Sequence, residues 1–335
     1  VHSTYSIDAF MFSLPILAGE GAHPPADACD FARYCAALDF FALTDHAEGL
    51  TPLHWALEKE SMRQCDERGG ASDPDLVAFL GFEWTQVGPT PETHYGHKNV
   101  IFPGLGDDEL PPRPISSLAD EGPGLFEGLA LASAARFVDP LNWSEYADFL
   151  WLLDELATVK RCERGVDTRE LPSDCHENAP TPEVLFEKLA QWGRDVQVIP
   201  HGSTWGLYTP PGTTMDKQLT RRQHDPERQR LVEIMSGHGN SEEYRSWRAV
   251  EWDANGEPIC PEPTPDYLPC CWRAGEIMRE RCGDLPEQEC EKRVEEAKRL
   301  ALQANVAPHR VFPDTRAEDW LDCGQCRDCF KPSFG

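Results

Sequence analysis

The sequence predicts an α/β fold in which a parallel sheet, closed into a barrel, is covered by helices. Short continuous apolar segments alternate with helical patterns over residues 1–250, and such segments are typical of strands buried on both faces. Several of these segments are followed directly by acidic residues or histidines, as at the carboxyl ends of barrel strands. The length of 335 residues accommodates a barrel with an additional region.

The first hundred residues contain two predicted helices and three predicted strands. Apolar residues at helical spacing cover residues 24–38. Thr51-Pro52 supplies a cap and a first-turn proline for a helix that extends to about Arg68. The predicted strands are the apolar runs at residues 40–44, 76–82 and 99–102.

Further helices and strands are predicted up to about residue 250. The many prolines, glycines and aspartates of residues 103–125 indicate a surface loop. Helices are expected at residues 146–159 and after Thr181-Pro182, where Gly193 marks the end. Residues 196–199 and 230–235 are the remaining predicted strands.

The composition changes near residue 254, where prolines and cysteines become frequent. Asp284-Leu285-Pro286-Glu287 is a capping box around a first-turn proline. It predicts a helix that places five residues on one face: Cys290, Val294, Ala297, Leu300 and Ala304. We therefore divide the chain into an α/β barrel at residues 1–253 and a cysteine-rich, proline-rich insertion or subdomain at residues 254–335.

The charge balance excludes two classes of partner. With 58 acidic and 31 basic residues, the net charge is −27, which disfavours nucleic acid as the main partner because phosphate contacts need clustered Lys and Arg. The same charge disfavours an anionic membrane surface. No stretch approaches the roughly 18 apolar residues of a spanning helix. The oligomeric state cannot be inferred from these features.

Thirteen cysteines are many for a cytosolic enzyme, and eight of them lie between Cys260 and Cys329. Disulfides in an oxidising compartment explain them best, which predicts an exported protein, for instance in a bacterial periplasm. A structural metal site is the second explanation, because Cys323, Cys326 and Cys329 have metal-like spacing. Mostly free thiols are the third.

Candidate metal ligands follow three predicted strands. Asp45-His46 follows the first, Glu83 the second, and His201 a later one. The carboxyl ends of parallel strands meet at one rim, so these side chains are expected to lie close together. Nitrogen and oxygen donors of this kind favour zinc, manganese or iron. Three further histidines are near these positions in the sequence: His2, His94 and His97.

Four segments resemble the PHP (polymerase and histidinol phosphatase) superfamily of metal-dependent hydrolases, and within it the bacterial domain-of-unknown-function family 3604. The first is Val1-His2-Ser3-Thr4-Tyr5-Ser6-Ile7-Asp8-Ala9, and the second contains Thr44-Asp45-His46-Ala47-Glu48. The third is Phe82-Glu83-Trp84-Thr85 with His97-Lys98-Asn99-Val100, and the fourth is Ile199-Pro200-His201-Gly202. Their order and approximate spacing agree with that superfamily over nearly the whole chain.

The resemblance implies a distorted (β/α)7 barrel with two or three divalent ions (Zn, Mn or Fe) at the strand carboxyl ends. The implied ligands are His2, His46, Glu83, His97 and His201, with Asp8 and His94 in reserve. The superfamily also uses a histidine that would precede Val1 and an Asp-x-His pair that would follow Gly335. We therefore expect part of the ligand set to be missing at both ends.

The implied activity is hydrolysis of phosphoesters, or of sulfate or phosphonate esters, by a metal-activated water. Glu83 is expected to hold the metal, and Asp45 either to orient a ligand histidine or to touch a metal itself. Candidate contacts to an anionic small-molecule ester are His238, Lys98, Arg221 and Arg222. Carbon–nitrogen hydrolysis of the amidohydrolase kind and a noncatalytic exported metal-binding or structural protein are the alternatives.

Overall fold

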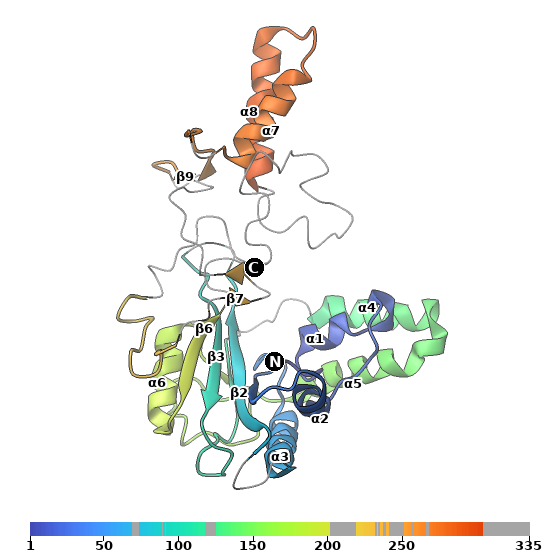
Figure 1. Cartoon of the computed structure of the whole chain (residues 1–335), viewed down its shortest axis with the longest axis vertical. Coiled ribbons are helices and arrows are strands. Elements are labelled where there is room, and N and C mark those ends of the chain that lie inside the picture. Colours follow the sequence, from blue (N-terminus) through green and yellow to red (C-terminus); the bar gives the residue numbers. More distant parts are fainter. Residues whose placement is uncertain are drawn as a thin grey trace. The chain divides into compact units, whose positions relative to one another are not determined.

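The chain divides into two compact units, which are described separately (Figure 1). The computed structural model describes residues 1–68, 74–88, 90, 92–117, 125–201, 219–231, 233, 235–236, 239–240, 251–255, 258–265 and 268–303. Unit 1 consists of residues 1–86, 97–199 and 220–231, and unit 2 of residues 87–96, 200–219 and 232–335. The cysteine-rich residues predicted as a subdomain, 254–335, lie within unit 2.

A four-stranded sheet in the order β1-β2-β3-β6 runs through unit 1 (Figure 1). Its strands are β1 (Phe40–Leu43), β2 (Val77–Gln86), β3 (Gly96–Phe102) and β6 (Gln197–His201). β1 pairs with β2 in parallel, as the sequence predicts. The predicted closed barrel is not formed by the described residues, because β1 and β6 are the two edges of the sheet.

Aromatic packing joins the sheet to helices α3 (Pro52–Arg68) and α6 (Pro182–Trp192). The Phe82 ring of β2 lies 6.2 Å from the Trp55 ring of α3 and 6.5 Å from the Trp192 ring of α6, measured between centroids. Phe102 of β3 contacts both Phe82 and Trp192. These large apolar side chains bury the central strands, which explains why their sequences are continuously apolar.

The ends of both helices follow the predicted capping signals. The Thr181 side chain accepts a hydrogen bond from the Val184 N–H at the start of α6, and Gly193 ends this helix with a φ of 65°. Glycine adopts that left-handed conformation without steric cost. Thr51 Oγ1 accepts a hydrogen bond from the His54 N–H in the first turn of α3. Both helices are confirmed.

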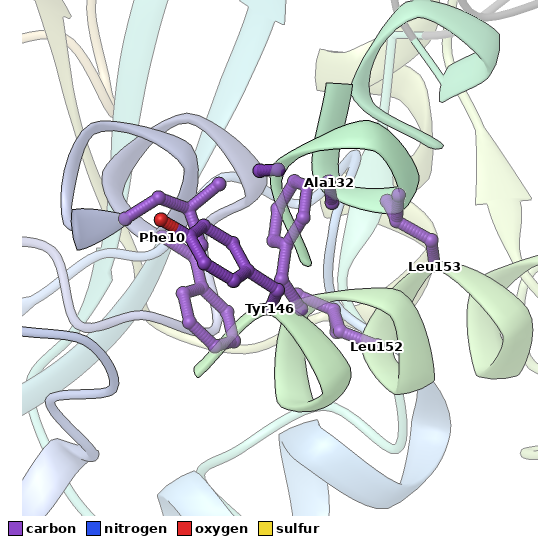
Figure 2. Packing of buried hydrophobic residues seen from close by; sticks show 8 residues of the cluster. Phe10, Ala132, Tyr146, Leu152 and Leu153 are labelled. Atoms are coloured by element: carbon purple, nitrogen blue, oxygen red, sulfur yellow. The ribbon is translucent and has the colours of Figure 1, made fainter. Parts of the chain in front are cut away.

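A separate helical layer of unit 1 was only partly predicted. It contains α1 (Ile7–Phe12), the short 3-10 helices at Pro15–Leu17 and Pro140–Asn142, α4 (Leu125–Val138) and α5 (Trp143–Thr158). Figure 2 shows Phe10, Tyr146 and Leu152 in the apolar cluster that holds this layer together. The sequence predicts most of α5 but gives no signal that was interpreted as α4.

The helix predicted at residues 24–38 is shorter than expected, and the face that carries Phe31 and Tyr34 is exposed rather than buried. It consists of α2 (Pro25–Asp30) followed by one π-helical turn at Phe31–Cys35. Phe31 is 63% exposed and Tyr34 70% exposed, whereas Cys29 is buried. The reason is a disulfide between Cys29 and Cys65 of α3, which turns the cysteine face of α2 inward.

Two other predictions need correction. The predicted surface loop at residues 103–125 contains β4 (Ile115–Ser116), a buried strand that pairs with β5 (Glu177–Asn178). The predicted strand at residues 230–235 is not formed at its start, where Leu231 is 57% exposed. The hydrogen bond to β6 is made two residues before the predicted strand, where the Arg228 carbonyl accepts from the Val198 N–H.

Unit 2 combines two short antiparallel strand pairs with a pair of helices. The strands are β7 (Met235–Ser236) with β8 (Gly239–Asn240), and β9 (Glu251–Trp252) with β10 (Pro258–Ile259). The helices are α7 (Cys270–Glu280), which was not predicted, and α8 (Glu287–Gln303), which was. On α8, Cys290 and Val294 are buried as predicted, but Leu300 is 50% exposed.

Four disulfides are present in the described part of the chain. Two lie in unit 2, at Cys260–Cys271 and Cys282–Cys290, within the region where the sequence predicts them. The others are Cys29–Cys65 and Cys162–Cys175 in unit 1. These bonds are compatible with an extracytoplasmic protein. Cys323, Cys326 and Cys329 lie outside the described residues. Among the described helices, none has the length and apolarity needed to cross a membrane.

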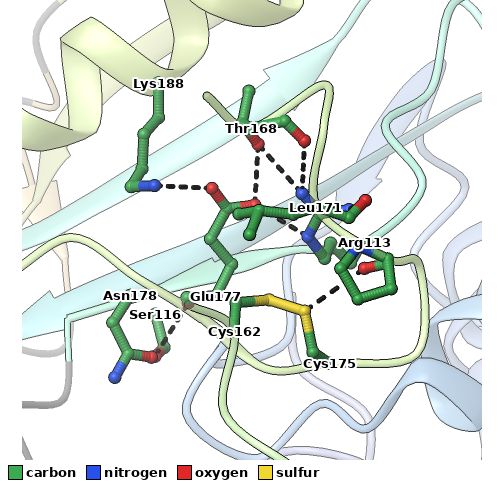
Figure 3. The surroundings of a disulfide bond; sticks show 10 residues. Arg113, Ser116, Cys162, Thr168, Leu171, Cys175, Glu177, Asn178 and Lys188 are labelled. Atoms are coloured by element: carbon green, nitrogen blue, oxygen red, sulfur yellow. Dashed lines mark hydrogen bonds and ion pairs between the residues drawn. A yellow bond between two sulfur atoms is a disulfide. The ribbon is translucent and has the colours of Figure 1, made fainter. Parts of the chain in front are cut away.

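A buried ion-pair network lies beside the Cys162–Cys175 disulfide (Figure 3). Arg113 Nε lies 2.8 Å from Glu177 Oε2, and Lys188 Nζ lies 2.6 Å from the other carboxylate oxygen of Glu177. The Arg113 guanidinium also donates to the Thr168 carbonyl at 2.5 Å. Because both cations contact the Glu177 carboxylate and the Arg113 guanidinium also has a carbonyl acceptor, their burial is tolerated, and they hold the loop at residues 162–175 against β4.

Removing one member of this network is expected to destabilise unit 1. The variant Arg113→Met fills much of the same volume but leaves Glu177 with only one cationic partner. We expect the free energy of unfolding to fall by about 3 kcal/mol, measured by urea denaturation. The control is Arg169→Met, whose pair with Asp167 is solvent-exposed, so we expect little or no change in the free energy of unfolding. Equal effects of both substitutions would contradict the structural role of the network.

Candidate metal centre

Three side chains of unit 1 form a group with the geometry of a metal site. One donor atom from each of His2, His46 and Glu83 lies within 4.8 Å of the others. His2 Nε2 is 3.2 Å from Glu83 Oε2, and the two imidazole rings stack with centroids 4.7 Å apart. His46 and Glu83 are buried and His2 is partly buried. All three are candidate ligands predicted from the sequence.

Main-chain hydrogen bonds bring these residues together beyond the end of β1. The Thr44 N–H donates to the Val1 carbonyl at 2.9 Å, which places His2 beside β1. The Glu83 N–H donates to the Asp45 carbonyl, and the Ala47 N–H donates to the Glu83 carbonyl, both at 2.9 Å. The parallel pairing of β1 with β2 therefore continues as a bridge between His46 and Glu83.

Asp8, His97 and Thr85 surround this group. Asp8 Oδ2, from α1, lies 3.2 Å from His46 Nε2. His97 Nδ1, from β3, lies 2.5 Å from Glu83 Oε1. Thr85 Oγ1 lies 2.6 Å from His46 Nδ1 and 3.1 Å from His97 Nδ1. The predicted ligand His97 and the reserve ligand Asp8 thus lie next to the three central residues.

Asp45 lies behind the site and is fully buried. Its Oδ1 accepts hydrogen bonds from the Ser3 N–H at 2.5 Å and from Ser6 Oγ at 3.3 Å, and its Oδ2 accepts one from Ser3 Oγ. Asp45 Oδ1 is also 3.7 Å from His2 Nδ1. Of the two roles predicted for Asp45, this geometry favours orienting His2 over touching a metal.

The carboxylates and imidazoles shift one another's pKa values. Burial alone would lower the pKa of His46, but Glu83 and Asp8 outweigh it and raise that pKa to about 10. Burial likewise lowers the pKa of His2, yet hydrogen bonds to Asp45 and Glu83 leave it above its usual range. Burial would raise the pKa of Glu83, but His46 and His97 hold it well below its usual range. The site thus favours anionic carboxylates and positive charge on the nitrogens.

The other predicted site residues are not members of this group of three. His94 and His201 belong to unit 2, where His94 is buried and His201 pairs with Glu233. Lys98 is fully buried, with its ammonium 5.5 Å from the centre of the Trp84 ring. Two predicted substrate contacts, Arg221 and Arg222, are exposed in a turn of unit 1. His238 lies outside the described residues.

Three residues near the site were not assigned a role from the sequence. Thr85 follows Glu83 by two residues and therefore lies on the same face of β2. The alternation of side chains along a strand could have predicted this from the sequence. Glu48 accepts a hydrogen bond from the Ser117 N–H at 2.7 Å, and burial raises its pKa. Glu58 of α3 is also fully buried. No local pattern in the sequence shows that a helical residue such as Glu58 faces this site.

The donor set fits a divalent ion. Two imidazoles and a carboxylate, with a second carboxylate and a third imidazole beside them, match the ligands that zinc, manganese and iron prefer. In addition, the site raises the pKa values of His2 and His46, which shows that it stabilises positive charge. A bound cation would replace these protons and relieve the same concentration of negative charge.

The raised pKa of His46 predicts a pH dependence of stability in the metal-free protein. The folded state binds this proton more tightly than the unfolded state, in which the pKa is 6.5. The stabilisation is therefore complete below pH 6.5 and is lost as the pH rises towards 10. We expect the free energy of unfolding, measured in urea with a chelator, to fall by at least about 1 kcal/mol across this window.

The variant His46→Gln isolates this contribution, because His2 and the buried carboxylates also titrate. Its unfolding free energy should fall less steeply with pH than that of the unmodified protein. The matched control is His23→Gln, since His23 is partly exposed and its side chain pairs with Asp27 at the protein surface. Parallel pH profiles for His46→Gln and the unmodified protein would show that His46 is not held in its charged form.

Comparisons with known proteins identify no relative. No protein-family model, no curated protein and no solved structure matches this chain. The chemical interpretation of the site therefore depends on its own side chains.

Proposed function

We propose that this protein is a metal-dependent hydrolase of phosphoesters, or of related sulfate or phosphonate esters, of the kind found in the PHP superfamily. The observation that carries the proposal is the group formed by His2, His46 and Glu83, with Asp8 and His97 in contact with it. Nitrogen and carboxylate donors hold labile, hydrolytically active ions better than thiolates would. In this proposal the protein holds its ions at the end of β1.

His2, His46 and Glu83 would hold the first ion, and Asp8 and His97 lie where they would assist them. A divalent ion bound there would lower the pKa of a water molecule and polarise the ester oxygen. Thr85 Oγ1 fixes the ring orientation of His46 by a hydrogen bond at 2.6 Å to Nδ1, which leaves Nε2 on the side of Asp8. Such contacts to the second ring nitrogen orient metal-binding histidines.

The carboxylates of the site would take different parts in hydrolysis. The Asp8 side chain is 40% exposed, so it can reach solvent and accept the proton of the attacking water. Burial would raise the pKa of Asp8, but His46 holds it well below its usual range, so this carboxylate is ionised in the metal-free protein. Glu83 and Asp45, both buried, would remain ionised and hold the histidines.

The location proposed for this activity is outside the cytoplasm, for instance in a bacterial periplasm. The disulfides Cys29–Cys65 and Cys162–Cys175 support this proposal, because they stabilise the same unit that contains the site. Such bonds persist in oxidising compartments and are rare where thiols are kept reduced. An oxidised protein preparation is therefore the appropriate form for testing activity.

Two substitutions test the proposal. His46→Ala and Glu83→Gln each remove a donor atom from the proposed site, and His23→Ala is the matched histidine control at a partly exposed position of unit 1. We expect metal affinity to fall by more than about a hundredfold in the first two, since even changes outside the ligand shell cost about 10–100-fold. Metal content is measured by elemental analysis after dialysis against Zn²⁺, Mn²⁺ or Fe²⁺.

Hydrolysis is measured on the same proteins with a panel of aryl phosphate, phosphonate and sulfate esters. The unmodified protein and His23→Ala should hydrolyse at least one class, and His46→Ala and Glu83→Gln should not. Equal metal content in all four proteins would refute the site. Metal binding without hydrolysis of any ester would instead support a noncatalytic metal-binding protein.

A further inference from the structure

We propose that Glu58 of α3 is a positioning residue for the metal centre: as a neutral carboxylic acid it donates a hydrogen bond to Asp45, and Asp45 in turn orients His2. This inference rests on the proposed function, because His2 is one of the proposed ligands. Glu58 itself would touch neither metal nor substrate. Its effect would pass through the Asp45 carboxylate.

The position of Glu58 within α3 is the first argument. Glu58 is 0% exposed and lies on the helix face that also contains Trp55, Met62 and Cys65, all of them buried. The spacing of these residues by three and four positions is that of a single apolar stripe. An apolar side chain would fill this place without the cost of burying a polar group. A carboxyl group here is therefore not required by packing.

The surroundings of the Glu58 carboxyl are the second argument. Within the described part of the chain, neither of its oxygens accepts a hydrogen bond. Its hydrogen-bonding neighbour is the side chain of Asp45, which is also a buried acid. Two adjacent buried carboxylates do not both ionise, so the pair shares one proton. A protonated carboxyl is a donor, and donation to Asp45 satisfies both groups.

The charges around the pair place the proton on Glu58. Burial, and then the neighbouring Asp45, raise the pKa of Glu58 well above its usual range. Asp45, by contrast, accepts hydrogen bonds from the Ser3 N–H, Ser3 Oγ and Ser6 Oγ, which favour its ionised form. Tyr5 and His54 also face this region, and neither places a positive charge beside Glu58: a tyrosine carries none, and burial lowers the pKa of His54.

The consequence for the site follows from the bonds of Asp45. Its oxygens accept from Ser3 and Ser6, and a donor from Glu58 completes the set. Held in this way, Asp45 Oδ1 lies 3.7 Å from His2 Nδ1 and accepts from Ser6 Oγ, which is itself 3.1 Å from that nitrogen, while His2 Nε2 faces Glu83 at 3.2 Å. If Glu58 were ionised, the repulsion would displace Asp45 or transfer the proton to it, and the Asp45–Ser6 contacts that orient His2 would be lost.

Two substitutions separate a donor from a simple space-filling role. Glu58→Gln keeps a neutral hydrogen-bond donor of the same size, whereas Glu58→Met keeps the volume and removes the donor. The matched control is Glu60→Met on the exposed side of the same helix. The affinity of each protein for Zn²⁺ and Mn²⁺ is measured by isothermal titration. We expect Glu58→Met to bind about tenfold more weakly and Glu58→Gln to bind like the unmodified protein.

The protonation state is measured independently of metal binding. Infrared spectra of the metal-free proteins near neutral pH should contain a carbonyl band of a buried carboxylic acid that disappears in Glu58→Gln and Glu58→Met and persists in Glu60→Met. Persistence of the same band in both Glu58 variants would overturn the inference, as would equal metal affinities for Glu58→Gln and Glu58→Met. If Glu58→Met does not fold, the Glu58→Gln spectrum is the test: loss of the carbonyl band supports a protonated Glu58, and persistence of the band refutes it.

These readouts also distinguish the inference from the proposed function. If the unmodified protein binds no divalent ion, the metal centre is refuted, whereas the infrared comparison still tests whether Glu58 holds a proton. If the unmodified protein binds metal and hydrolyses esters, but both Glu58 variants do the same with unchanged affinity, the positioning role alone is refuted.

Discussion

The candidate site depends on one piece of main-chain pairing, the continuation of the β1–β2 ladder beyond the end of β1. Hydrogen bonds from Glu83 to Asp45 and from Ala47 to Glu83 hold two chain segments in register. His46 and Glu83 are consequently brought together by backbone geometry, before any side-chain attraction acts. Because a slip of one residue would turn every side chain to the other face, this pairing determines whether the site exists at all.

Charge balance is the second constraint, and it links the site to the core. Asp8, Asp45 and Glu83 are ionised in a largely buried region, which is tolerated only with compensating positive charge or donors. The histidines provide the positive charge in the absence of a cation. Serine hydroxyls and main-chain N–H groups provide donors, as Ser3 does for Asp45. The buried carboxylates therefore cost folding free energy, and the same negative charge favours binding of a cation.

The loop at residues 162–175 leads into a residue, His176, that contacts the chain just after β1. The Cys162–Cys175 disulfide closes the loop directly before His176, whose Nε2 donates to the Ala47 carbonyl at 2.9 Å. Ala47 is also the residue whose N–H donates to Glu83. The ion pair of Arg113 with Glu177 holds the next residue of this segment. The Cys162–Cys175 disulfide and the Arg113–Glu177 ion pair are thus connected to the candidate metal site through residues 176–177 and the main chain of Ala47.

Local signals in the sequence determined much of unit 1. The apolar runs predicted β1, β2 and β3, and Thr181 and Gly193 predicted both ends of α6, because propensity and capping act over a few residues. His46 and Glu83 were identified from their places after predicted strands, although Glu83 lies within β2, which extends to Gln86. Tertiary structure alone decided that the described sheet stays open, that α2 turns its cysteine face inward, and that Glu58 meets Asp45. These outcomes depend on contacts between distant residues, which no local pattern encodes.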